Sequence, residues 1–301
     1  MAGDRLSVRV GSAVAELLDD EPIAIAPLSG GDVARAMRVE LASGKVVFAK
    51  THDHPPAGFF TTEAAGLRWL ADAGAVRVPG VLAATDGGGP RDDGPLAVLV
   101  LDWIDEASAV AAVDEAAFGR DLAALHRAGA PHFGRADRRP TGSLQLPNDP
   151  CATWAEFLAT RRLLPLVRIA RDRRSAEPSV LTAIERIASD LEGFGGADEP
   201  PARLHGDLWA GNRVIDASGH SWLIDPAAHG GHREFDLAMM RLFGGFSDEV
   251  FSAYAEVAPL SERWQGRIGL HQLAPLLVHA IRFGGPYRGA LQATVDSLDR
   301  R

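Results

Sequence analysis

The strongest chemical signal in the sequence is the run HGDLWAGN at residues 205–212, followed by Asp225 after a short apolar stretch. Within this run Asn212 stands five residues after Asp207. Phosphoryl transfer from a nucleotide requires a carboxylate that accepts the proton of a hydroxyl, and oxygen ligands that hold a divalent cation against the phosphates. The pattern therefore predicts Asp207 as the catalytic base, Asn212 and Asp225 as Mg²⁺ ligands, and ATP as the donor.

Residues 205–207 on their own have a second interpretation. His-Gly-Asp is equally typical of a turn before a helix, with Asp207 as the helix cap. The longer pattern favours chemistry, because the Asp-x4-Asn spacing, an apolar strand that ends in Asp225 and an upstream lysine occur in one chain.

The upstream lysine stands out because the sequence contains only two, Lys45 and Lys50. Lys50 ends an apolar run at residues 46–50 that predicts a strand, and from such a position a kinase lysine contacts the α- and β-phosphates of ATP. Glu63, near the start of the next predicted helix, is the expected partner of its ammonium group. The alternative is a solvated lysine and a surface glutamate with no shared role.

Two weaker signals concern nucleotide binding. Gly30 and Gly31 lie between two predicted strands, where backbone N–H groups bind phosphate, but the full glycine pattern of protein kinases is absent and a plain hairpin turn remains open. After the apolar run 96–101, residues 102–105 are expected to link two lobes. We assign adenine recognition there to the backbone of Asp102 and Ile104.

The elements that position these residues change character along the chain. Up to residue 102 the pattern predicts one amphipathic helix at 4–20, a β-meander at 23–50, a helix capped by Thr61 or Thr62, and two strands at 81–84 and 96–101. Beyond it, helical periodicity dominates at 114–127, 154–173, 179–191 and from Asp236. Asp236 is expected to have a mainly structural role, either as the cap of its own helix or as a link to the catalytic loop. The predicted class is α+β and bilobal, with a nucleotide-binding lobe at 1–102 and a catalytic and substrate lobe at 103–301.

Composition narrows the class of protein. The net charge of −9 argues against a nucleic-acid partner, because phosphate neutralisation requires an excess of Lys and Arg. One cysteine and the lack of a long apolar run or a signal-peptide pattern predict a reduced, soluble, cytoplasmic protein with no membrane segment. A monomer is expected, but the sequence leaves the oligomeric state open. Histidine spacing predicts no zinc site; the histidines considered are His126, His229, His232, His271 and His279.

The motifs, taken in chain order, resemble those of the fructosamine kinase (ketosamine-3-kinase) family. HGDLWAGN alone is shared with aminoglycoside, choline and homoserine kinases and indicates only the wider protein-kinase-like superfamily. More specific are the run from Leu223 to Phe246 and the landmarks at 28–32, 48–50, 63–67, 125–127 and 283–285. The resemblance therefore covers nearly the whole chain.

The resemblance implies transfer of the γ-phosphate of ATP to the 3-hydroxyl of a ketosamine, such as a fructosamine or ribulosamine, after which the product decomposes and frees the amine. It assigns Lys50 to phosphate binding and Asp207 to the base, and it makes Trp209 a candidate for contact with the sugar. Alternatively, Trp209 has only a structural role and packs against the rest of its loop. By order along the chain, the segment 141–148 is placed near the acceptor.

Two departures from the family and two alternatives complete the prediction. His232 stands where the family is usually acidic, and the segment 28–32 has no cysteine for redox control. A kinase of another hydroxylated amine, such as an aminoglycoside, remains open. A pseudokinase without transfer activity is disfavoured, because Lys50, Glu63 and the residues of the catalytic run are all present.

Overall fold

A computed structural model describes residues 2–29, 34–87, 94–107, 113–135, 144–194 and 199–299. The chain forms two compact units. Unit 1 comprises Met1–Asp72, Arg77–Val113 and Val214–Asp225, and unit 2 comprises Ala73–Val76, Asp114–Arg213 and Pro226–Arg301. Unit 1 therefore extends beyond residue 102 and also contains a later segment. None of the described helices combines the length and hydropathy that a membrane span requires.

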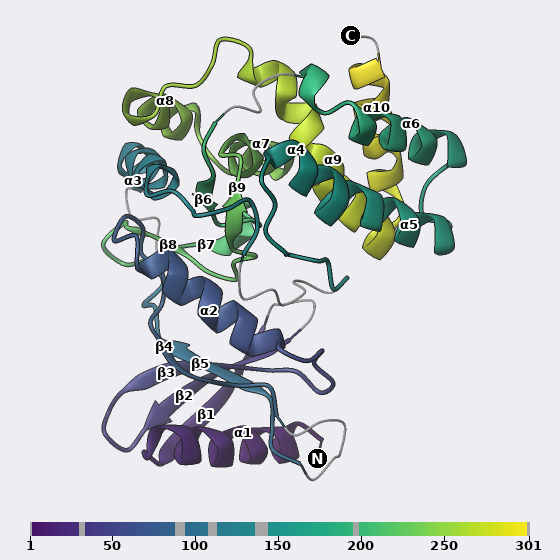
Figure 1. The fold of residues 1–301 in the computed structure, drawn as a ribbon. Coiled ribbons are helices and arrows are strands. Elements are labelled where there is room, and N and C mark those ends of the chain that lie inside the picture. Colours follow the sequence, from purple (N-terminus) through teal and green to yellow (C-terminus); the bar gives the residue numbers. More distant parts are fainter. Residues whose placement is uncertain are drawn as a thin grey trace. The chain divides into compact units, whose positions relative to one another are not determined.

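Unit 1 is built around a five-stranded antiparallel sheet with the strand order β1-β2-β3-β5-β4 (Figure 1). Its strands are β1 (Pro22–Leu28), β2 (Arg35–Leu41), β3 (Val46–Thr51), β4 (Val81–Thr85) and β5 (Val98–Asp102). The predicted β-meander and the two later strands are confirmed. The α+β class, with the sheet in the N-terminal part of the chain and helices after it, is confirmed as well.

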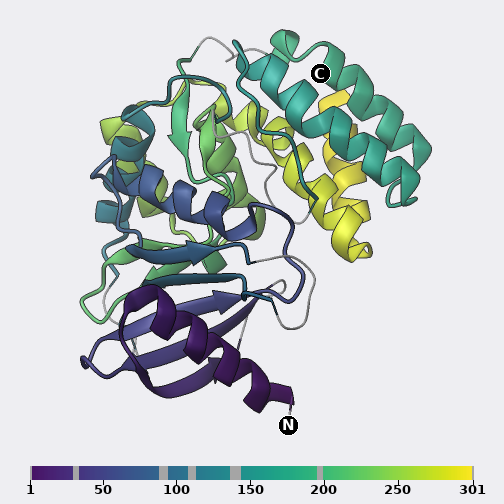
Figure 2. The ribbon, with the colours of Figure 1, turned by 60° about the horizontal axis from the view of Figure 1, so that its bottom comes forward.

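One helix covers each face of this sheet. α1 (Ala2–Leu18) packs against Val98 and Val100 of β5, and α2 (Phe59–Ala71) packs against Leu99 and Leu101. Figures 1 and 2 both show α1 lying along one face. Because side chains alternate between the two faces of a strand, consecutive residues of β5 enter different cores, and the strand is apolar throughout.

The start of α2 differs from the prediction. The helix begins at Phe59 after Gly58, whose φ of 80° is left-handed, so Thr61 and Thr62 lie inside it and do not cap it. The cap comes from Asp86, which accepts hydrogen bonds from the backbone N–H groups of Phe60 and Thr61 at 2.7 and 3.2 Å. A carboxylate from the loop after β4 thus satisfies the free N–H groups of the first turn.

Unit 2 is mainly helical, as predicted. Its main core packs residues of α4 to α6, α9 and α10 around Phe157, Leu163 and Leu277. The predicted helix 154–173 is continuous but contains the π-helical turn η1. The helices are α3 (Glu115–Arg127), α4 (Trp154–Phe157), η1 (Leu158–Leu163), α5 (Leu164–Asp172), α6 (Pro178–Ser189), η2 (Glu192–Phe194), α7 (Glu234–Phe243), α8 (Asp248–Val257), α9 (Trp264–Phe283) and α10 (Pro286–Asp299).

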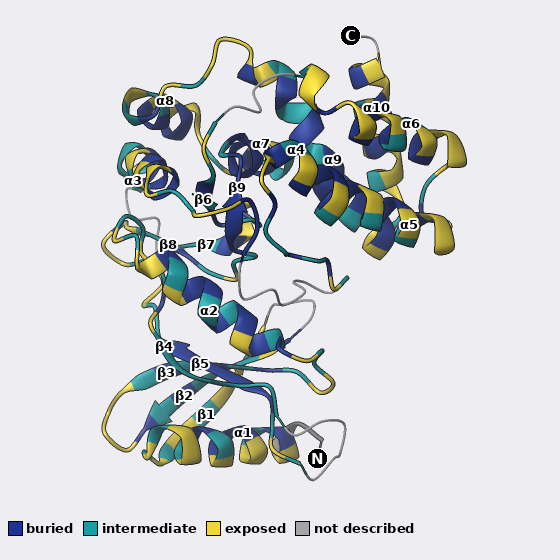
Figure 3. Ribbon diagram, in the orientation of Figure 1, coloured by how far each residue is buried: buried dark blue, intermediate teal, exposed yellow. Residues whose placement is uncertain are grey.

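Two short strand pairs support the polar segments. In unit 2, β6 (Ala202–Leu204) pairs antiparallel with β9 (His229–Gly231), so the chain enters the run 205–212 directly from a buried strand. β9 and most of α7 are buried, as their dark blue colour in Figure 3 shows. β7 (Arg213–Ile215) pairs with β8 (Ser221–Leu223), and β8 leads to Asp225.

Candidate active site

Lys50 lies on the face of β3 that α2 covers, because Ala49 occupies the opposite core with α1. Its Nζ atom is 3.0 Å from an oxygen of Glu63 and 2.8 Å from an oxygen of Asp225. Burial alone would lower the pKa of Lys50, but attraction and hydrogen bonds from the two carboxylates raise it above its ordinary value. Lys50 is therefore a fixed cation whose position two carboxylates define.

The run 205–212 forms a compact loop that ends in the 3₁₀ turn η3 (Ala210–Asn212). Gly206 has a φ of 81°, and a Cβ there would meet the carbonyl oxygen of Ala227 at 2.2 Å, so the turn requires glycine. The Nδ2 atom of Asn212 donates hydrogen bonds to the backbone carbonyl of Asp207 at 2.8 Å and to its Oδ2 atom at 3.1 Å. The loop thus fixes the rotamer of the predicted base.

Asp236 anchors this loop from the first turns of α7. Its carboxylate accepts the backbone N–H of His205 at 2.8 Å and that of Gly206 at 2.9 Å, and His126 Nε2 lies 3.3 Å away. Burial alone would raise the pKa of Asp236. The hydrogen bond from His126, the attraction of nearby positive charge and the bonds from the backbone outweigh burial and hold this pKa below its ordinary value. α7 starts at Glu234, so Asp236 lies in its first turn and does not cap it. Of the two roles considered for Asp236, the link to the catalytic loop is the one that the hydrogen bonds support.

The predicted adenine-binding residues lie at the end of β5 and just beyond it. Asp102 is the last residue of β5; its backbone N–H donates to the carbonyl of Gly80 at 2.9 Å, and its side chain pairs with Lys45. The backbone N–H of Asp102 is therefore already used within unit 1, while Ile104 lies in the irregular stretch beyond the strand. Gly30 and Gly31 lie outside the described residues.

Trp209 is one of the few large apolar side chains that unit 2 leaves exposed, with 41% of its surface accessible. Its indole lies over Gly211, where a Cβ would come within 2.2 Å of the ring. Gly245, with a φ of 84°, packs against Ala210, and a Cβ there would approach the alanine methyl to 2.5 Å. Glycines on both sides of the loop therefore leave room for Trp209 and for the turn after α7.

The segment placed near the acceptor by chain order is only partly described, because residues 141–143 lie outside the described part. Asn148 is fully buried, and its Oδ1 atom accepts a hydrogen bond from Arg162 of η1 at 2.9 Å. Burial lowers the pKa of Arg162 to about 9. In the described part, this segment is tied to the helical core.

The fold brings together a histidine cluster that sequence spacing did not reveal. Buried His232, Glu234 and His271 each offer a ligand atom, and these atoms lie within 4.8 Å of one another. However, Glu234 Oε2 already accepts a hydrogen bond from Arg267 at 2.8 Å. Although burial opposes ionisation, contacts with His271 and Arg267 lower the pKa of Glu234 to about 2. We interpret the cluster as an ion network joining α7 to α9.

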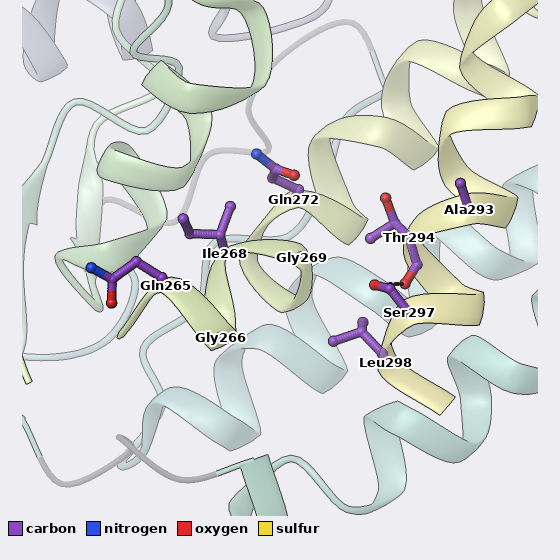
Figure 4. A pocket seen from close by; sticks show the side chains of 9 residues that line it. All are labelled: Gln265, Gly266, Ile268, Gly269, Gln272, Ala293, Thr294, Ser297 and Leu298. Atoms are coloured by element: carbon purple, nitrogen blue, oxygen red, sulfur yellow. Dashed lines mark hydrogen bonds between the residues drawn. The ribbon is translucent and has the colours of Figure 1, made fainter. Parts of the chain in front are cut away.

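A pocket of about 400 Å³ lies between α9 and α10 (Figure 4). Its lining consists of glycines and short polar or apolar side chains: Gln265, Gly266, Ile268, Gly269, Gln272, Ala293, Thr294, Ser297 and Leu298. Gln272 donates its amide hydrogen to the carbonyl of Ala238. The pocket contains none of the predicted site residues and offers no charged group for chemistry.

The arrangement defines a class of enzyme. A sheet that carries a lysine paired with a helix glutamate, and a helical unit that holds an Asp-x4-Asn loop, are the parts of a phosphotransferase with the protein-kinase-like fold. A family model for fructosamine kinase matches residues 13–301. The chain belongs to the fructosamine kinase family.

Individual relatives agree with this assignment. A Thermus thermophilus protein named "Probable ketoamine kinase" is 35% identical over 271 residues, which cover 90% of this chain and 92% of the relative. The crystal structure of a protein provisionally assigned as a fructosamine-3-kinase, from Thermobifida fusca, has a TM-score of 0.87 and 42% identity, with 97% and 99% of the two chains covered. Macrolide 2'-phosphotransferase type I, with a TM-score of 0.60, 16% identity and 97% and 96% coverage, shares the fold.

Proposed function

We propose that this protein is a ketosamine 3-kinase, which transfers the γ-phosphate of ATP to the 3-hydroxyl of a ribulosamine or fructosamine. The observation that carries the proposal is the fixed Asp207–Asn212 pair in a chain that matches the fructosamine kinase family from residue 13 to residue 301. The family relation supports the acceptor class, and the carboxylate supports the chemistry.

In the proposed reaction the 3-hydroxyl oxygen forms a bond to the γ-phosphorus of ATP. The bond from that phosphorus to the β–γ bridging oxygen breaks, ADP leaves, and the hydroxyl proton passes to the Asp207 carboxylate. Asn212 donates a hydrogen bond to one oxygen of Asp207 and so orients the carboxylate that is proposed to accept the substrate proton. A base that is oriented before substrate binds contributes by positioning as well as by proton transfer.

The nucleotide roles follow from the chemistry of the donor set. Asn212 uses its amide nitrogen on Asp207, so its remaining polar atom is an oxygen, and Asp225 offers an exposed carboxylate; hard oxygen ligands of this kind suit Mg²⁺. Mg²⁺, when bound, neutralises charge on the transferring phosphate. Lys50 is proposed to orient the phosphates with Glu63 as its anchor, with adenine at the backbone of Asp102 and Ile104.

The test of the substrate class is a panel of acceptors assayed for ATP consumption with Mg²⁺. We expect turnover of synthetic ribulosamine and fructosamine, with phosphate on the 3-oxygen by ³¹P and ¹³C NMR. If only aminoglycosides were phosphorylated, the proposed acceptor class would be wrong, but the assignment as a kinase would stand. ATP binding without transfer to any acceptor would indicate a pseudokinase.

Lys50→Met is expected to lower kcat/KM for ATP about 10- to 100-fold, because it removes a charge-assisted contact and leaves Glu63 and Asp225 without the cation between them. The measurement is initial velocity against ATP concentration. Lys45→Met is the matched control, since Lys45 is the other lysine of the protein and pairs with Asp102 at a half-exposed position. Equal effects of the two substitutions on kcat/KM would show that Lys50 does not contact the nucleotide.

A further inference from the structure

Five ring side chains of unit 2 form a continuous strip that starts at the catalytic loop. The ring centroids of Trp209 and Phe243 are 6.1 Å apart, and those of Phe243 and His279 are 4.8 Å apart. His279 in turn lies 4.9 Å from Tyr287 and 5.5 Å from Phe283. We call these five residues the aromatic strip. It joins the loop 205–212 to the ends of α7 and α9 and the start of α10.

The two ends of the aromatic strip face solvent. Trp209 is 41% exposed and Phe283 is 48% exposed. Among the described residues, few large apolar side chains are as exposed as these two. In unit 2 the other described side chain of this kind is Leu164 of α5. Exposed apolar groups that form one connected surface mark a binding site more often than isolated ones do.

The strip is held close to the predicted base by local structure. Trp209 is two residues after Asp207 in a loop whose turn is closed by a hydrogen bond from the Trp209 N–H to the Asp207 carbonyl at 3.2 Å. Phe243 ends α7, the same helix whose Asp236 anchors the loop. The predicted base and the inner end of the strip therefore belong to the same short loop.

The charges near the outer end of the strip are positive. The Arg282 guanidinium lies 4.9 Å over the Phe283 ring, and Arg288 lies beside Gly284. α9 contains no acidic residue, and the acidic residues of α10 lie in its second half. Burial lowers the pKa of His279, so its ring is uncharged at neutral pH and packs as an aromatic group. This end of the strip repels a polycation and attracts a carboxylate.

We propose that the aromatic strip binds the amine portion of the acceptor and selects amines that carry an apolar or aromatic group together with a carboxylate, as amino acids and peptides do. The inference rests on the proposed function, because it requires a ketosamine hydroxyl at Asp207. Trp209 contacts the atoms next to the sugar, Phe283 and Tyr287 contact the apolar part of the amine, and Arg282 and Arg288 meet its carboxylate. Polyamine adducts and aminoglycosides are disfavoured by the same charges.

The test compares ribulose adducts of four amines: phenylalanine, phenethylamine, glycine and methylamine. We expect kcat/KM to be highest for the phenylalanine adduct and lowest for the methylamine adduct. Phe283→Ala should lower kcat/KM for the two aromatic adducts roughly tenfold, mainly by raising KM. The same substitution should change kcat/KM for the methylamine adduct less than about twofold. Arg282→Gln should lower kcat/KM about fivefold for the two carboxylate adducts only, and added salt should reduce their advantage in the unchanged protein.

Matched controls lie on α5. Leu164→Ala removes an apolar side chain of 41% exposure, and Arg168→Gln removes an exposed arginine; neither belongs to the strip, and both should leave the substrate order unchanged. If ketosamines are phosphorylated but Phe283→Ala and Arg282→Gln change all four adducts equally or not at all, the inference fails alone. If no ketosamine is phosphorylated, the proposed function fails and the inference fails with it.

Discussion

Asp207→Asn is expected to lower kcat by ~10²- to 10⁴-fold at saturating ATP and acceptor, the range for loss of a positioned general base. The amide is nearly the same size as the carboxylate, and its oxygen still accepts the hydrogen bond from Asn212 Nδ2. The loop geometry should therefore persist while the proton acceptor is lost. Steady-state kinetics with a ribulosamine, together with a nucleotide-binding titration, separate the catalytic effect from an effect on ATP affinity.

The control for this substitution is Asp172→Asn, a change of the same size and charge at an exposed position on α5. It should leave kcat and the melting temperature unchanged. Retention by Asp207→Asn of kcat within fivefold of the unchanged protein would show that another group accepts the proton. A large fall in melting temperature would instead indicate that Asp207 acts through the fold.

The features predicted correctly from the sequence depend on neighbours in the chain. The alternation of β3 and the period of α2 place Lys50 and Glu63 on facing surfaces, and the structure joins them at 3.0 Å. Asp207 and Asn212, which were predicted together from their spacing, lie in one loop, where the structure adds a hydrogen bond between them. In each case the partners are close in the chain, so local geometry largely decides the contact.

The features that the sequence did not reveal depend on partners that are distant in the chain. Asp86 caps α2 from a loop that follows β4, and no spacing rule connects a helix start with a carboxylate in a later loop. For Asp236 the sequence left two roles open, helix cap or link to the catalytic loop, and only tertiary packing decides for the backbone of that loop. His232 and His271 meet only because α7 packs against α9.

The proposed chemical groups are positioned by separate sets of contacts. Lys50 and Asp225 are held within unit 1, whereas Asp207 and Asp236 are held within unit 2. Because these contacts lie within different units, the effects of substitutions in the two sets on the free energy of unfolding are expected to add. Their effects on turnover need not add, because groups that act in one reaction step depend on each other.

Asp236→Ala is expected to lower the free energy of unfolding by about 3–5 kcal/mol, the cost of leaving several buried groups without their charged partner. The groups concerned are the N–H donors of His205, Gly206 and His126. Urea denaturation measures the change. Asp248→Ala is the control, because that carboxylate pairs with Arg241 while 88% exposed and should cost less than about 1 kcal/mol. Equal losses for the two variants would contradict the anchoring role.

The pH dependence of unfolding gives an independent test of the same anchor. The pKa of Asp236 is lower in the folded protein than its ordinary value near 4, so its contribution to stability is fully present above about pH 4. That contribution is lost as the pH falls from there through the lower folded pKa. Asp236→Asn removes the titrating group, so its free energy of unfolding should fall less steeply with decreasing pH below about pH 4 than that of the unchanged protein. Parallel pH profiles for the two proteins would mean that Asp236 does not hold the loop as a carboxylate.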